Sequence, residues 1–110
     1  MSSALSDAQA LLRHAESSPY VDVDQRRDRA TIRRAGARIA TLDLESGALT
    51  IFLSAELVSP IVAAHPQLRT ARDGVRLDVH DSDSLTAGEQ LLRWRIGHEL
   101  FASQWQNASP

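Results

Sequence analysis

The chain has 110 residues, a formal net charge of -2 and an isoelectric point near 6.0, which predict a single domain over residues 1–110 and disfavour a dedicated nucleic-acid binder. It contains no cysteine, and all 12 basic residues are arginines, so thiolate chemistry and lysine-dependent chemistry are excluded. The N-terminus lacks a secretory pattern and no stretch approaches roughly 20 apolar residues, so we expect a cytoplasmic protein without membrane contact.

The N-terminal segment predicts a helix over Ser6–Glu16, because apolar residues recur there at helical spacing and Pro19 follows. Two short strands are predicted next, at Tyr20–Asp24 and Ala30–Arg34, with Ala35–Gly36 as the turn after the second. A helix over Asp28–Arg34 is the alternative, since arginine and alanine both favour helix.

The clearest local pattern is a β-hairpin. Arg38–Leu44 and Leu49–Leu53 alternate in polarity, and Glu45–Gly47 supplies a turn in which glycine can adopt positive φ. One face of this hairpin carries Ala40, Leu42, Leu44, Leu49, Ile51 and Leu53.

A second helix is predicted over Ala55–Ala64, with Pro60 as a cause of a late start or a kink. A strand over Val75–Val79 follows. The last element is a helix over Ala87–Gln104, which Thr86 and Glu89 begin as a capping box.

The predicted fold class is α+β, with an antiparallel sheet of about four strands, helices mainly on one face and the order α-β-β-β-α-β-α. We expect the first few residues and residues 106–110 to fray.

The final helix has two apolar stripes at 100° per residue. Leu92, Ile96 and Leu100 form the first, which suffices to bury the helix against a sheet. The second stripe is covered either by another helix of the chain or by a partner. Because tryptophan is enriched at interface hot spots, we predict an interface between two copies or with another protein. The interface candidates are Leu91, Trp94, His98, Phe101 and Trp105.

An arginine-rich segment spans residues 26–38. It is typical of a solvated face that nearby aspartates partly neutralise. The alternative is an anion patch, because guanidinium groups suit phosphate and carboxylate. The anion-binding candidates are Arg26, Arg27, Arg29, Arg33, Arg34 and Arg38.

Other chemistry has little support in the sequence. No two histidines have helical metal-ligand spacing, and the residues His80–Asp83 fit a loop and helix cap better than a cation site. No glycine-rich phosphate loop and no glycine-flanked serine are present. We therefore predict no catalytic residues, no metal and no cofactor.

The order of the hairpin Gly36–Asp43 with Leu49–Leu53, the strand Val75–Val79 and the helical segment Leu91–Ile96 resembles the bacterial luciferase-domain family of small proteins. Members often carry a His-x-His pair on the first hairpin strand. Thr41 and Asp43 stand at those positions here, so no ligand role carries over. The stretch Ile39–Leu44 and the strand after it are also similar to the YjbR-like family, which is described as having a DNA-binding-like fold. Neither resemblance implies a defined activity.

The sequence predicts a non-enzymatic interaction or binding domain that is homodimeric through its C-terminal helix. A nucleic-acid- or anion-binding protein that uses residues 26–38 is the second reading. A small-molecule-binding protein or an enzyme, with a pocket between sheet and helices, is the third.

Overall fold

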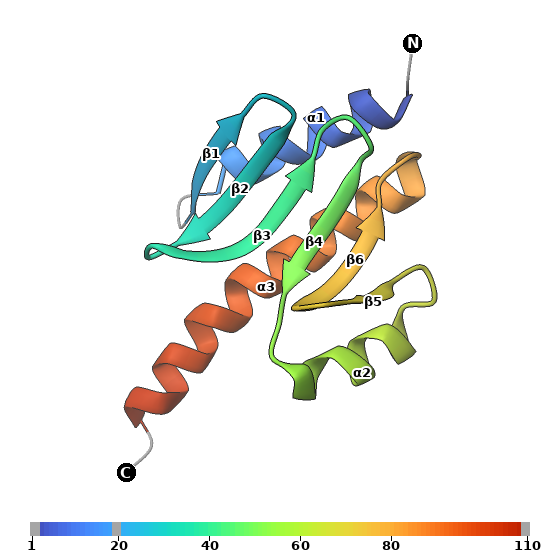
Figure 1. Ribbon diagram of the computed structural model, residues 1–110. Helices are drawn as coiled ribbons and strands as arrows, with labels where there is room; N and C mark the ends of the chain where they lie inside the picture. Colours follow the sequence, from blue (N-terminus) through green and yellow to red (C-terminus); the bar gives the residue numbers. More distant parts are fainter. Residues whose placement is uncertain (1–2, 19–20, 109–110) are drawn as a thin grey trace.

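The computed structural model describes the backbone of residues 3–18 and 21–108 and the side chains of residues 7–18 and 21–97. This part of the chain forms an α+β fold with three helices and a six-stranded antiparallel sheet (Figure 1). The helices are α1 (Ser3–Glu16), α2 (Ala55–Ala64) and α3 (Ser82–Ala108). The strands are β1 (Asp22–Arg26), β2 (Arg29–Arg34), β3 (Ala37–Asp43), β4 (Ala48–Phe52), β5 (Arg69–Ala71) and β6 (Gly74–Asp78), and the sheet order is β1-β2-β3-β4-β6-β5.

The sheet corrects the predicted strand number and order. It has six strands rather than about four, and the elements run α-β-β-β-β-α-β-β-α. The added strand β5 is a three-residue edge strand with mostly exposed side chains, so it lacks the alternating polarity by which strands are found in a sequence. The helical alternative for Asp28–Arg34 is wrong, because β2 pairs with β1 and β3 and buries Ala30 and Ile32 on one face.

Tight turns set the hairpin registers. Ala35 and Gly36 join β2 to β3 with φ of 52° and 83°, as a turn with two left-handed residues requires. Gly47 joins β3 to β4 with φ of 79°, and a Cβ at this position would meet the carbonyl oxygen of Val79. Both turns lie where the sequence predicts them.

A β-bulge changes the facing of residues in β3. The pairing passes from Ile32 opposite Ala40 to Arg33 opposite Arg38, so Ile39 is an extra residue in the ladder. Ile39 and Ala40 are consequently both buried. Arg38 lies on the other face of the sheet, where its guanidinium stands over the ring of Phe52.

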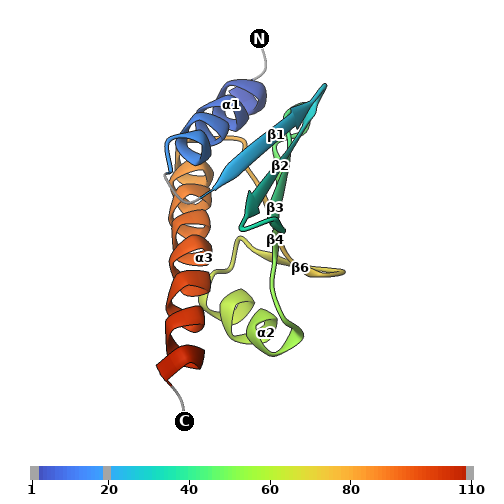
Figure 2. The ribbon, with the colours of Figure 1, turned by 90° about the vertical axis from the view of Figure 1, so that its left-hand side faces the viewer.

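All three helices lie on one side of the sheet (Figure 2). α1 and α3 pack against each other over the central strands, and α2 packs against β5 and β6. The core between these layers includes the expected stripe of α1, in which Ala8, Leu11, Leu12 and Ala15 are buried. No helix in the described ranges has the length and apolar character needed to cross a membrane.

α3 begins at Ser82, several residues before the predicted start at Ala87. The expected capping box of Thr86 and Glu89 is wrong, because Thr86 lies inside the helix and donates its hydroxyl to the carbonyl of Ser82 (2.9 Å). Asp81 caps the helix instead. Its Oδ1 accepts hydrogen bonds from the backbone N–H (2.8 Å) and the hydroxyl (2.7 Å) of Ser84.

Candidate interaction site

The two stripes of α3 have different surroundings. Leu92 and Ile96 face the core and are 0% and 8% exposed, as their stripe predicts. On the second stripe Leu91 is buried, but Trp94 is 39% exposed and is the only exposed large apolar side chain among residues 7–18 and 21–97. The side chains of Leu100, His98, Phe101 and Trp105 lie outside the described residues.

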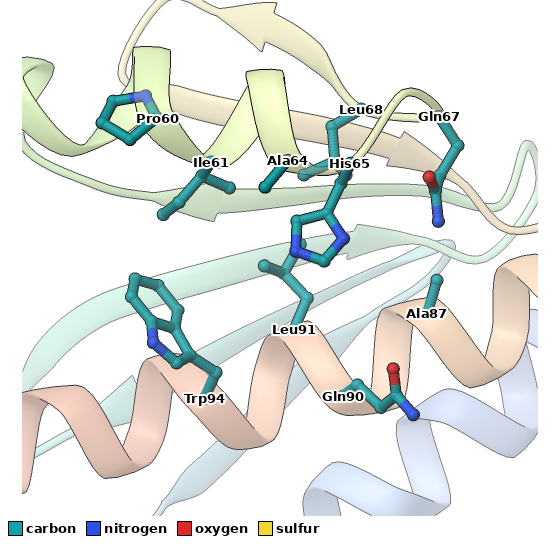
Figure 3. A pocket seen from close by; sticks show the side chains of 10 residues that line it. All are labelled: Pro60, Ile61, Ala64, His65, Gln67, Leu68, Ala87, Gln90, Leu91 and Trp94. Carbon is teal, nitrogen blue, oxygen red and sulfur yellow. The ribbon is translucent and has the colours of Figure 1, made fainter.

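A groove separates the second stripe from α2. It has a volume of about 390 Å³ and we call it the α2–α3 groove. Figure 3 shows Trp94 rising from α3 toward α2, while the His65 ring extends from the loop after α2 toward Leu91. The residues that line the α2–α3 groove are Pro60, Ile61, Ala64, His65, Gln67, Leu68, Ala87, Gln90, Leu91 and Trp94.

The groove exists because α2 is an apolar helix that the rest of the domain covers incompletely. Val58, Ile61 and Val62 are partly buried against the core, and no residue of α2 is fully buried. Pro60 lies inside α2 without a late helix start, and its ring lines the groove. α2 therefore faces the first half of the second stripe, but it leaves an open apolar channel rather than a sealed contact.

The C-terminal half of α3 projects from the body of the protein. Both views show its last turns running beyond the end of the sheet (Figures 1 and 2). The helix has 27 residues, which corresponds to about 40 Å at 1.5 Å per residue. This projection accounts for the elongated shape, with extents of 54 × 29 × 22 Å.

Gly97 directly follows Ile96, the last buried side chain of the described part of α3. It is exposed, and a Cβ built on it would meet no atom within 4 Å among the described residues. A glycine in a helix interior costs roughly 0.5–1 kcal/mol relative to alanine. Nothing in the described part of the chain requires a glycine at this position.

The arginine-rich segment does not form one patch. Arg27 lies in the β1–β2 turn with φ of 54°, and Arg26 pairs with Asp24 at 3.4 Å. Arg29 lies at the start of β2 near Asp43, whereas Arg34, at the other end of the strand, has a buried Nε without a hydrogen-bond partner among the described atoms.

Two pairs of arginines in that segment are cross-strand neighbours, Arg26 with Arg29 across β1 and β2 and Arg33 with Arg38 across β2 and β3. Arg33 and Arg38 lie on the face opposite the helices. The structure adds Phe52, Arg69 and Arg76 to the same face, and sequence reasoning missed all three. Their alternation with buried Ile51, Val75 and Leu77 is the signal that places Phe52 and Arg76 there.

Asp43, His80 and Asp81 serve local structure. The backbone N–H of Ser46 and then that of Glu45 lower the pKa of Asp43, and Ser84 lowers the pKa of Asp81 in the same way. A hydrogen bond to the Asp78 carbonyl raises the pKa of His80, helped by the charge of Asp81. No cluster of three metal-ligating side chains occurs within residues 7–18 and 21–97.

Comparison with known proteins identifies no relative: the chain matches no protein-family model, no curated protein and no solved structure. The resemblances drawn from apolar spacing stay predictions.

Proposed function

We propose that this chain is a protein-interaction domain that forms a homodimer through α3. The observation that carries the proposal is the exposure of Trp94 at the mouth of an apolar groove, on a helix that continues past its own domain. Tryptophan is enriched at interface hot spots, where it fills apolar contacts of a partner.

The spacing of the second stripe supports a helical partner. Its residues are separated alternately by four and three positions, which is the heptad pattern of helices that pack along their length. They are Ala87, Leu91, Trp94, His98, Phe101 and Trp105. A second copy carries the same stripe, so a twofold contact is self-complementary without any further feature.

Gly97 supports the same partner. It stands beside the stripe, between Trp94 and Phe101 in sequence, and a glycine lets a second backbone approach closely. A small molecule in the α2–α3 groove would account for Trp94 and Leu91, but it would not account for a glycine on the projecting part of the helix.

Sedimentation equilibrium of the whole chain tests the proposal. We expect a wild-type dimer in the micromolar range, and a dimer dissociation constant raised at least about 30-fold by Trp94→Ala or by Trp105→Ala, as for a hot-spot residue. Arg13→Ala is the control, because Arg13 is exposed on α1 and not on the helix that carries the stripe.

A wild type that stays monomeric at about millimolar concentration would overturn the homodimer. If that monomer also binds an apolar fluorescent dye, and Trp94→Ala abolishes the binding, the groove is a small-molecule site instead. Equal weakening by Arg13→Ala would show that the contact is not made by the stripe.

A further inference from the structure

The face of the sheet opposite the helices is open, and we call it the open face. Figure 2 shows no described element on it. The strand registers place one residue from every strand in a single row across this face. In strand order the row reads Asp24, Thr31, Thr41, Thr50, Arg76 and Arg69.

An aromatic ring and an arginine occupy the neighbouring row. Phe52 follows buried Ile51, so its ring lies on the open face, and the Arg38 guanidinium is 5.2 Å from the ring centroid. Gly74 is paired opposite Phe52 and places no side chain beside the ring. An aromatic ring with an arginine plane against it is a surface on which nucleic-acid bases stack.

Three aspartates on this face are already engaged, whereas Asp22, directly opposite Arg33, forms no ion pair among the described residues. Asp24 pairs with Arg26 at 3.4 Å and Asp78 with Arg76 at 3.1 Å. Asp43 Oδ1 accepts the backbone N–H groups of Glu45 and Ser46 at 2.9 and 3.1 Å. These carboxylates are therefore held by their own neighbours.

Three arginines of the open face have no such partner. Arg33, Arg38 and Arg69 form no ion pair with a carboxylate of the described residues. Arg33 is directly opposite Arg38, and Arg69 is directly opposite Arg76. Like charges directly opposite in a sheet destabilise it, and a phosphate bound between two guanidinium groups would offset that repulsion.

We infer that the open face binds single-stranded nucleic acid, with a base stacked at Phe52 and Arg38 and phosphates held by Arg33, Arg38 and Arg69. From β2 to β5 the face spans roughly 19 Å at about 4.8 Å per strand, which limits the site to a few nucleotides. The ligand is a single strand because a duplex keeps its bases stacked inside and cannot present one to the ring.

Fluorescence anisotropy with a labelled 12-nucleotide single strand, in about 50 mM salt, tests the inference. We expect Phe52→Leu and Arg38→Gln each to weaken binding about tenfold or more. Arg13→Gln removes the same charge from the exposed surface of α1, on the helix side, and should leave binding nearly unchanged. With about three phosphates neutralised, the logarithm of the affinity should fall with the logarithm of salt at a slope of about -2.

Three results would overturn the inference. The first is a wild type that does not bind the single strand at low salt. The second is equal affinity for inorganic polyphosphate or for a duplex of the same length, which would reduce the site to charge alone. The third is loss of binding in Arg13→Gln equal to that in Arg38→Gln.

Far-UV circular dichroism verifies that each variant is folded, and Arg33→Gln replaces any variant that is not. The oligomeric state is measured separately, so failure here leaves the homodimer proposal unaffected.

Discussion

Gly88 and Gly97 belong to the same helix but have opposite surroundings. A Cβ on Gly88 would touch the side chains of Leu11, Leu49 and Leu77 at 3.4–3.5 Å, whereas a Cβ on Gly97 would touch nothing within 4 Å among the described residues. The first glycine lies within the contact of α3 with the sheet and α1. The second makes no such contact with the described part of its own domain.

This difference extends to the two halves of α3. The first half is specified by contacts within the chain, since Leu92 and Ile96 are buried against the sheet. The second half projects beyond the sheet and continues an apolar stripe that begins at Leu91 and Trp94. A helix that continues without a layer beneath it gains little stability from its own domain, because most helical stability in proteins comes from tertiary packing.

The largest expected effect on the free energy of unfolding comes from the first stripe of α3, which is buried, and distinguishes it from the second stripe. Leu92→Ala should lower the free energy of unfolding by about 2–5 kcal/mol, because it leaves a cavity beneath a fully buried side chain. Trp94→Ala, measured in dilute protein where the dimer has dissociated, should cost much less, since the ring is 39% exposed. Urea unfolding followed by circular dichroism measures both.

Sedimentation should show the opposite order of effects for these two variants. Trp94→Ala should dissociate the dimer, and Leu92→Ala should preserve it under conditions in which the variant is still folded. If Trp94→Ala destabilised the dilute monomer as much as Leu92→Ala does, the second stripe would belong to the core and the contrast between the halves of α3 would fail.

Gly97→Ala should have a smaller effect, which is favourable for the stability of the monomer and unfavourable for association. In the monomer this change should raise the free energy of unfolding by about 0.5–1 kcal/mol, because alanine favours helix and the added methyl group meets open space. In the dimer it should weaken association, because the methyl group stands where a partner helix approaches. Thermal unfolding at low concentration and sedimentation at high concentration measure the two effects.

Gly88→Ala is the matched control for that change. Its methyl group would make ordinary contacts with three leucine side chains of the core, so we expect no effect on association. A Gly97→Ala variant that is more stable and associates as tightly as the wild type would contradict a close helix contact at Gly97.

The sequence predicts well where pattern and turn chemistry agree. The central hairpin is predicted correctly, because Leu42 and Leu49 alternate with polar residues and Gly47 closes the turn. α2 has the predicted bounds Ala55–Ala64. It fails at β5, because a three-residue exposed edge strand has no alternation to detect. It also fails at the start of α3, where Thr86 and Glu89 have capping spacing but Asp81 caps the helix.

The contact between Arg38 and Phe52 on the open face shows a second limit of prediction from the sequence. Regular alternation through β3 would place Arg38 on the same face as Ala40 and Leu42, which are buried. The bulge at Ile39 reverses this and brings Arg38 onto the ring of Phe52, a residue of the neighbouring strand β4. A bulge depends on how two strands pair, so the polarity pattern of one strand does not reveal it. For the same reason a linear segment of arginines was a poor guide to which arginines meet.

The smallest expected effect concerns Asp81, which caps the N-terminal end of α3. Asp81→Asn keeps a side-chain oxygen for the cap but removes the charge. The hydrogen bonds from Ser84 lower the pKa of Asp81 below its ordinary 3.8, so the ionised carboxylate stabilises the folded state. That contribution is fully present above the unfolded pKa and is lost as the pH falls through the folded pKa. The wild type should therefore be slightly more stable than Asp81→Asn near pH 7, and the difference should vanish in acid.

Urea unfolding of both proteins from about pH 2 to pH 7 measures this difference in stability. The acid response of Asp43 cancels in the comparison, because both proteins share it. Parallel stability profiles would show that the charge of Asp81 does not contribute to the start of α3, and would leave the buried Leu92 and Ile96 as what fixes the first half of the helix.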